Sequence, residues 1–163
     1  MPMNIDQQYI LIVEDEWLLK ALYEHVLEDV GFKQDKPPFD YELDGWVVHF
    51  AATKEQAADL IKRNAYESVF LDHKLAQGKT SEALVPQIFR TSPDCEIFLT
   101  SSDPLKQRAA VAAELAKENM DAHSAQLKEH KKDNITGLTN YFNSKIRPTD
   151  RIRPAGQSPS PRS

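Results

Sequence analysis

Short apolar runs alternate with longer amphipathic stretches along this chain, and this alternation restricts the fold more than any other feature. Four runs are apolar enough to form buried strands: 9–13, 46–51, 68–71 and 95–99. The stretches between them repeat apolar residues every three or four positions, which is typical of helices with one buried face. Strands that alternate with helices in this way favour a largely parallel sheet covered by helices.

Five helices are predicted from this spacing and from helix start and stop signals. They are expected at 17–30, 54–64, 80–90, 104–119 and 134–146. Gly31 stands where a C-cap glycine belongs, and Thr53 with Gln56 forms a capping box. Pro86 is expected to kink the third helix.

Two regions depart from this regular alternation. The connection at 31–45 is long for a loop between a helix and a strand, and we expect a short hairpin in it around 41–43. The last strand, expected at 122–128, shows only modest alternation and little β-propensity. Both ends of the predicted sheet are therefore its least regular parts.

The domain boundaries follow from the same pattern. We expect one domain at 8–146, preceded by an extension at 1–7 and followed by a tail at 147–163. The tail is rich in proline, serine and arginine, a composition typical of a disordered basic segment. Because only this tail follows residue 146, we expect no DNA-binding or enzymatic domain after the predicted one.

Composition restricts the classes of function. Hydrophobic residues make up 40% of the chain, enough for a packed core, and the net charge of −5 argues against a surface that coats nucleic acid. The single cysteine, Cys95, suits a reducing compartment, and no run approaches the ~20 apolar residues of a membrane span. We therefore expect a cytoplasmic protein with no membrane contact and no direct DNA binding.

Polar side chains follow three of the predicted strands. Glu14 and Asp15 follow the first strand, Asp72 follows the third and Thr100 follows the fourth. In a sheet of strand order 2-1-3-4-5 these strands are neighbours, so their carboxyl ends bring the four side chains into one pocket. Crowded carboxylates repel one another unless a cation joins them, and Mg²⁺ prefers such oxygen ligands. The sequence therefore predicts a Mg²⁺ site beside a carboxylate that can act as a nucleophile.

Three segments resemble the receiver domains of two-component response regulators. Residues 10–16 (ILIVEDE) look like the acidic opening motif of that family, 69–75 (VFLDHKL) like the segment around its phosphoacceptor, and 97–101 (IFLTS) like the strand that ends in its switch hydroxyl. The resemblance covers about 8–146. It implies an α/β, flavodoxin-like fold: a doubly wound, parallel five-stranded sheet of order 2-1-3-4-5 with helices on both faces. The chain then resembles a divergent, single-domain, chemotaxis-regulator-like receiver.

Carried over position by position, the resemblance implies a role for each residue of the site. Asp72 matches the phosphoacceptor. Glu14 and Asp15 match the acidic pair, with Asp15 as the direct Mg²⁺ ligand, and the backbone carbonyl of Lys74 matches the group that completes the metal shell. Thr100 matches the hydroxyl that reorients to bind the phosphoryl group.

The lysine that pairs with the phosphoryl group in this family is matched to Lys128, with Lys117 as the alternative. If Lys128 ends the last strand, its ammonium group is expected opposite Asp72. Two other positions depart from the family pattern. Ala125 stands where an aromatic switch residue is usual, and Glu129 stands where a proline usually follows the lysine.

The resemblance implies that Asp72 accepts a phosphoryl group from a histidine kinase or a phosphotransfer protein, and that the chain signals to a downstream target protein by contact. Its only enzymatic activity is then the Mg²⁺-dependent phosphorylation and dephosphorylation of itself. The departures keep open a second hypothesis, a receiver-like interaction module that takes no phosphate. A third, a Mg²⁺-dependent phosphatase or nuclease domain, needs an Asp-x-Asp pair after a strand, but Lys74 stands at its second position.

Overall fold

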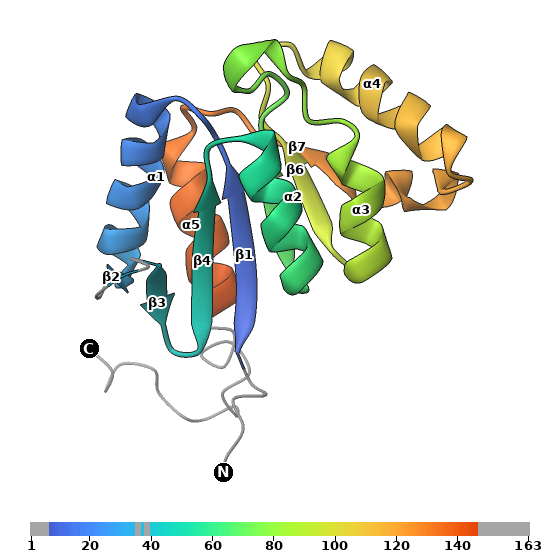
Figure 1. Ribbon diagram of the computed structural model, residues 1–163. Helices are drawn as coiled ribbons and strands as arrows, with labels where there is room; N and C mark the ends of the chain where they lie inside the picture. The colour runs from blue at the N-terminus through green and yellow to red at the C-terminus, as the bar shows by residue number, and fades with distance from the viewer. Residues whose placement is uncertain (1–6, 35–36, 38–39, 147–163) are drawn as a thin grey trace, which may run out of the picture.

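The computed structural model describes residues 7–34, 37 and 40–146 and shows an α/β fold (Figure 1). The expected tail at 147–163 and nearly all of the expected N-terminal extension lie outside the described residues. No helix within the described ranges is long and apolar enough to cross a membrane.

Seven strands and five α-helices make up the described fold. The strands are β1 (Gln8–Val13), β2 (Lys33–Gln34), β3 (Tyr41–Leu43), β4 (Trp46–Ala51), β5 (Ser68–Leu71), β6 (Glu96–Leu99) and β7 (Leu127–Glu129). The α-helices are α1 (Trp17–Val30), α2 (Lys54–Arg63), α3 (Leu84–Thr91), α4 (Pro104–Lys117) and α5 (Ile135–Ile146). Two short 3₁₀ helices, η1 (Ala76–Gly78) and η2 (Asp121–Gln126), lie in the connections.

All strands belong to one sheet, in the order β2-β3-β4-β1-β5-β6-β7. The five strands from β4 to β7 are parallel and have the predicted 2-1-3-4-5 order, because β4 is the second of them along the chain. β2 and β3 pair antiparallel beside β4, so the expectation of a wholly parallel five-stranded sheet is wrong at this edge.

The extra strands arise from the long connection at 31–45, where a short hairpin was predicted. β3 and β4 are joined by Asp44 and Gly45, which both have positive φ angles, 50° and 87°. Two central residues with positive φ match the twist of a two-residue hairpin turn, which is why asparagine, aspartate and glycine are favoured there. Tyr41 of β3 is buried, so the hairpin extends the core as well as the sheet.

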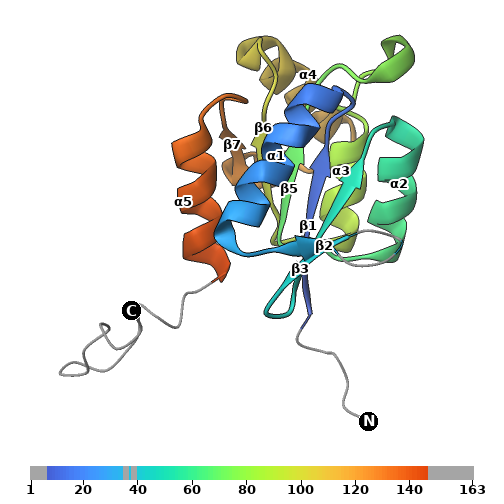
Figure 2. The ribbon, with the colours of Figure 1, turned by 90° about the vertical axis from the view of Figure 1, so that its left-hand side faces the viewer.

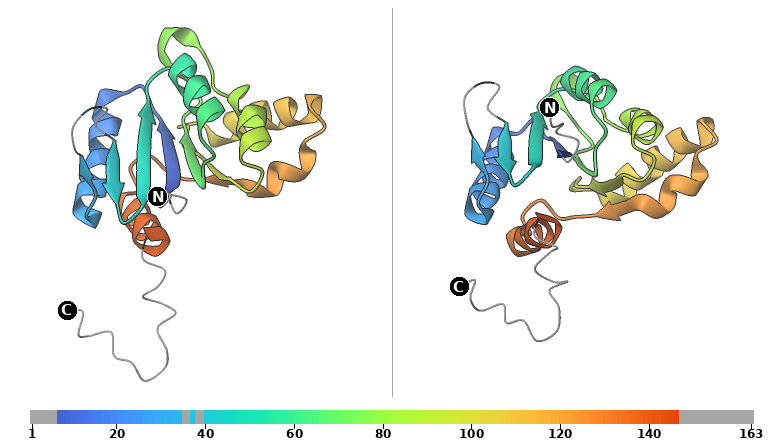
Figure 3. Two further views of the ribbon diagram at one scale, coloured as in Figure 1. Left: turned by 60° about the horizontal axis from the view of Figure 1, so that its bottom comes forward. Right: turned by 90° about the horizontal axis from the view of Figure 1, so that it is seen from below.

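Helices cover both faces of the sheet (Figures 2 and 3). On one face, α1 and α5 pack on a core that includes Ile10 and Ile12 of β1. On the other face, α2, α3 and α4 pack on a core that includes Leu11 and Val13. Successive side chains of a strand point to opposite faces, so β1 contributes to both cores. A central strand that is apolar throughout is the pattern expected of a strand buried on both sides.

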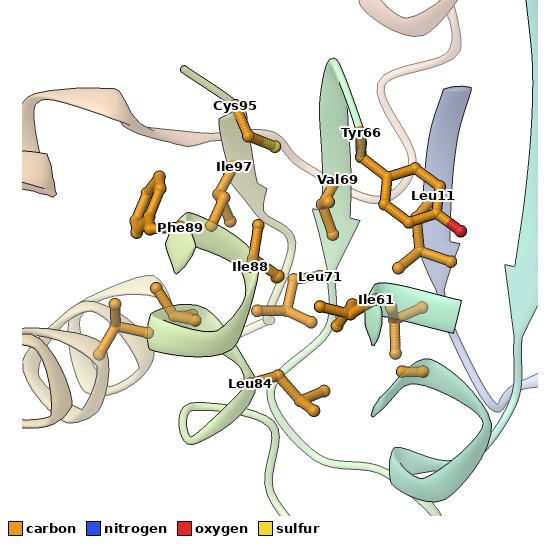
Figure 4. Close-up of a cluster of buried hydrophobic side chains, with 14 of the residues drawn as sticks. Leu11, Ile61, Tyr66, Val69, Leu71, Leu84, Ile88, Phe89, Cys95 and Ile97 are labelled. Atoms are coloured by element: carbon orange, nitrogen blue, oxygen red, sulfur yellow. The ribbon is translucent and has the colours of Figure 1, made fainter. Parts of the chain in front are cut away.

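In the core on the face covered by α2, α3 and α4, large aliphatic side chains of the strands pack against those of the helices (Figure 4). Leu71 and Ile97 from the sheet lie against Ile61 of α2 and Ile88 of α3, and all four are at most 1% exposed. Each buried aliphatic side chain of this kind contributes about 1.5–3 kcal/mol relative to an exposed one. This packing holds the carboxyl ends of the strands in a fixed arrangement.

Several local predictions need correction. α3 begins at Leu84 instead of residue 80, so Pro86 lies in the first turn and does not kink the helix. A proline in the first turn breaks no helical hydrogen bond, because the first N–H groups have no partner within the helix. Leu18 and Ile135 each lie in the first turn of a helix and are 59% and 43% exposed.

The last strand is shorter than predicted. Residues 121–126 form the 3₁₀ helix η2, and only Leu127–Glu129 pair with β6. The ring of His123 stacks on Phe89 of α3, with centroids 4.3 Å apart, and this contact keeps the segment beside α3 instead of in the sheet. The strand therefore reaches the carboxyl edge later in the sequence than expected.

Candidate functional site

The pairing of three parallel strands places polar residues side by side at one edge of the sheet, the upper edge in Figure 1. Val13 of β1 pairs with Leu71 of β5, and Leu71 pairs with Leu99 of β6. The residues that follow these strand ends are Glu14, Asp72 and Thr100. Hydrogen bonds continue the register past the strands: the Asp72 N–H donates to Val13 O at 3.2 Å, and the Thr100 N–H donates to Leu71 O at 3.1 Å.

Three carboxylates form a compact cluster at this edge. One carboxylate oxygen from each of Glu14, Asp15 and Asp72 lies within 4.8 Å of the other two. Glu14 and Asp72 are buried, at 3% and 6% exposure, whereas Asp15 is exposed. The structure thus brings together the acidic residues that the sequence predicted.

Glu14 has the most perturbed environment of the cluster. Burial and the negative charge of Asp72 raise the pKa of Glu14 to about 7, despite the opposing effects of Lys132 and the Glu16 N–H. Its Oε2 accepts a hydrogen bond from that N–H at 3.2 Å. Its Oε1 is buried and has no hydrogen-bond partner among the described residues. A buried carboxylate oxygen without a partner is costly, and a cation beside it removes that cost.

Asp72 is held by contacts to both carboxylate oxygens. Oδ1 accepts a hydrogen bond from the N–H of His73 at 2.8 Å, and Oδ2 lies 3.0 Å from Nζ of Lys132. The buried Ser81 hydroxyl donates to the backbone carbonyl of Asp72, which ties the following loop to the same point. Asp72 therefore has a fixed position within the carboxylate cluster.

Lys132, which the sequence analysis did not identify, supplies the positive charge of the site. Its Nζ also lies 3.6 Å from Oε1 of Glu14. Partial burial disfavours the charged form of this lysine, but the hydrogen bond and charge of Asp72 and the charge of Glu14 outweigh it and raise the pKa of Lys132. Lys132 is thus an ammonium ion held between two carboxylates.

Lys128 does not lie opposite Asp72, contrary to the expectation. It sits within β7 opposite Phe98, and its Nζ is 4.0 Å from Glu96, the first residue of β6. The short β7 is the physical reason, because the chain passes the carboxyl edge only after Glu129. Lys117, the alternative, ends α4 and pairs with Glu114 at 3.0 Å.

Of the remaining predicted residues, Lys74 lines a pocket at this site, whereas Thr100 is buried and is not among the lining residues. A pocket of about 270 Å³ lies over Asp72, and its lining includes Lys74 and Ser101. Thr100 is 1% exposed, and its side chain lies near the hydroxyl of Tyr23 of α1, a contact that sequence reasoning missed. Lys106 of α4 also lines the pocket and adds a second positive charge to its wall.

No aromatic side chain takes the expected switch position. Ala125, matched to it by sequence, lies in η2 and is exposed. If Lys132 is taken as the family's lysine, the switch position, three residues earlier, falls on Glu129. Oε2 of Glu129 lies 3.2 Å from Nε of Arg108. The departure from the family at this position therefore holds with either lysine.

Solved structures that resemble this chain include receiver domains. The match to a signal receiver domain of an HD domain-containing protein from Pseudomonas fluorescens Pf-5 covers 94% of this chain and 98% of that domain, with a TM-score of 0.59 at 18% identity. A CheY-like receiver domain protein from Methanospirillum hungatei JF-1 covers 90% and 98%, with a TM-score of 0.58 at 16% identity. A response regulator from Thermotoga maritima, solved in complex with Mg²⁺–BeF, covers 86% and 99%, with a TM-score of 0.51 at 19% identity.

No protein-family model and no curated protein matches the sequence. At such low identities the structural likeness shows the fold alone. The chain has the fold of a CheY-like response-regulator receiver domain over about nine-tenths of its length, as the three sequence motifs predicted.

Proposed function

We propose that this chain is a receiver that accepts a phosphoryl group on Asp72 from a histidine kinase or a phosphotransfer protein. The phosphoryl group then controls contact with a downstream target protein, and the chain removes the group by its own slow hydrolysis. One observation carries the proposal: a buried aspartate at a strand end lies beside two further carboxylates and 3.0 Å from a lysine ammonium, below an open pocket.

The donor set at this edge fits Mg²⁺. Carboxylate oxygens are its preferred protein ligands, and Glu14 offers a buried oxygen that has no hydrogen-bond partner among the described residues. Asp15 and Asp72 are the direct ligands in this proposal, and the backbone carbonyl of Lys74, a residue that lines the same pocket, is the third. When bound, the ion neutralises negative charge on the phosphoryl oxygens during transfer.

The side chains around Asp72 then have separate tasks. Asp72 Oδ attacks phosphorus in line with the leaving group, which forms an acyl phosphate. Lys132, already at Asp72, pairs with a phosphoryl oxygen once Asp72 carries the phosphoryl group. Thr100 ends the neighbouring strand, and its hydroxyl turns from Tyr23 toward the new negative charge.

The proposal is tested with Mg²⁺ and beryllofluoride, which mimics a phosphoryl group on a carboxylate. Titration of the wild type, followed by ¹H–¹⁵N spectra, is expected to shift the amide signals of Asp72, Thr100 and Ser101. Asp72→Asn is expected to abolish the shifts. Asp59→Asn is the matched control, because Asp59 is an exposed carboxylate on α2 paired with Arg63. A wild type that does not respond, or an Asp72→Asn variant that does, contradicts the proposal.

A second function, an interaction module that takes no phosphate, is favoured by one observation. Lys132 lies within 3.6 Å of both buried carboxylates, so the chain carries an internal cation at the place where Mg²⁺ is proposed. Incubation with acetyl phosphate and Mg²⁺, followed by mass spectrometry, separates the two functions. Addition of one phosphoryl group at Asp72 supports the receiver, whereas an unmodified protein supports the interaction module.

A further inference from the structure

Gln107 of α4 is the only fully buried amide side chain among the described residues, and it lies at the junction of three elements behind the site. It is 0% exposed. Its Nε2 donates to the carbonyl of Leu71 at 2.8 Å, and its Oε1 accepts from the N–H of Ser101 at 3.1 Å. One side chain thus links α4 to the residue before Asp72 and to the residue after Thr100.

The two backbone groups that Gln107 binds belong to the machinery of the site. The Leu71 carbonyl also accepts the Thr100 N–H, so it joins β5, β6 and α4 at one oxygen. Ser101 lines the pocket over Asp72. A movement of the segment at Thr100 and Ser101 therefore changes the contact between Gln107 and the sheet.

The same segment is also tied to the start of α4. The Ser101 hydroxyl accepts the N–H of Asp103 at 3.0 Å, and Asp103 caps α4 by accepting the N–H of Lys106 at 3.2 Å. Ser101 is thus connected to α4 through the helix cap and, one turn further, through Gln107. These connections make α4 the element most directly affected by a displacement of Ser101.

We propose that Gln107 is a positioning residue that couples the phosphoryl state of Asp72 to α4, through competition for the N–H of Ser101. This inference rests on the proposed function. An anion attached to Asp72 occupies the pocket that Ser101 lines, and its charged oxygens accept stronger hydrogen bonds than a neutral amide does. When the anion takes the Ser101 N–H, the buried Oε1 of Gln107 loses its partner. An unpaired buried acceptor is unfavourable, so α4 shifts until Gln107 finds a new partner.

This arrangement supplies a coupling route in a chain that lacks the aromatic switch residue. In the described structure no aromatic side chain of β7 replaces it, and Glu129 pairs with Arg108 instead. The Gln107 contacts oppose the phosphorylated state, because one of them must break when the anion binds. Removal of the amide is therefore expected to favour anion binding while it disconnects α4.

Gln107→Met tests the coupling, because methionine keeps the length of the side chain and removes both hydrogen bonds. In ¹H–¹⁵N titrations with Mg²⁺ and beryllofluoride, we expect Gln107→Met to bind beryllofluoride about fivefold more tightly than the wild type. The amide of Ser101 should still shift, and the α4 amides beyond Gln107 should lose most of the shift seen in the wild type. Gln107→Asn, whose shorter amide cannot span the two backbone groups, should behave in the same way, and it serves if the methionine variant does not fold.

Gln126→Met is the matched control. Gln126 also holds two backbone groups by its amide, the carbonyls of Pro93 and Cys95, but it lies in η2 and does not line the pocket over Asp72. It is expected to leave the affinity and the α4 shifts at wild-type values. Wild-type affinity and wild-type α4 shifts in Gln107→Met would overturn the coupling alone. A wild type that does not bind beryllofluoride would instead overturn the proposed function on which the coupling rests.

Discussion

The raised pKa of Glu14 has a consequence for stability that can be measured without any knowledge of a partner. Burial and the charge of Asp72 raise this pKa from an ordinary value of 4.5 to about 7 in the folded chain. The folded state therefore holds a proton on Glu14 over a range of pH in which the unfolded chain has released it. The stabilisation from protonated Glu14 is fully present below pH 4.5. It is lost as the pH rises from 4.5 to about 7.

The magnitude follows from the size of the shift. A difference of roughly 2.5 pKa units corresponds to about 3 kcal/mol over the whole window, at about 1.36 kcal/mol per unit. Roughly 2–3 kcal/mol of this falls between pH ~5 and pH ~8. Glu14→Gln removes the titrating group, so the pH-dependent loss of unfolding free energy should be smaller than in the wild type by this amount.

Urea unfolding in EDTA at the two pH values measures the effect in the metal-free protein. Glu118→Gln, at an exposed glutamate paired with Arg90, is the control and should retain the pH dependence of the wild type. In the proposed site Mg²⁺ binds the charged carboxylates, so its addition should restore stability to the wild type at the higher pH. An equal pH dependence in the wild type and in Glu14→Gln would refute the argument that burial beside Asp72 raises this pKa.

Three further predictions follow from the described contacts. Lys132→Met removes the cation between the two buried carboxylates, so Mg²⁺ should bind several-fold more tightly in a calorimetric titration while the beryllofluoride-induced shifts weaken. Lys128→Met is the control and should change neither the affinity nor the shifts. Equal effects of the two variants would argue against Lys132 as the lysine that pairs with the phosphoryl group. Thr100→Val should keep Mg²⁺ affinity within about twofold and lose the beryllofluoride-induced amide shift at Ser101; a retained shift would show that the hydroxyl is not needed. Gly45→Ala places a side chain at a φ of 87° and should lower the free energy of unfolding by about 1 kcal/mol or more in a urea titration, whereas no loss would mean that the hairpin turn adapts.

The acidic site could be predicted from the sequence because it depends on few structural choices. Parallel strands end at the same edge of a sheet, so residues that follow three neighbouring strands must meet once the strand order is known. Glu14, Asp72 and Thr100 each follow a short apolar run by one residue, and the observed register places them together as expected. Errors of a residue or two in a helix boundary do not alter this arrangement.

The position of Lys132 beside Asp72 could not be predicted from the sequence in the same way. Its position depends on where β7 begins, and that is decided by contacts distant in sequence, such as the stacking of His123 on Phe89. The segment before Lys132 has only modest apolar alternation, too little to reveal this register. Gln107 was missed for a related reason, because a glutamine in an amphipathic helix is ordinarily exposed.

The hairpin built from 31–45 changes which backbone groups the sheet presents to other molecules. Without it, the six-residue β4 would be a long outer strand with free N–H and C=O groups, open to pairing with a strand from another chain. Here the outermost strands are two-residue β2 and three-residue β7, and each carries a lysine. Edge-to-edge strand addition is therefore disfavoured at both sides of the sheet, which directs association with other proteins to helical surfaces and to the loops around Asp72.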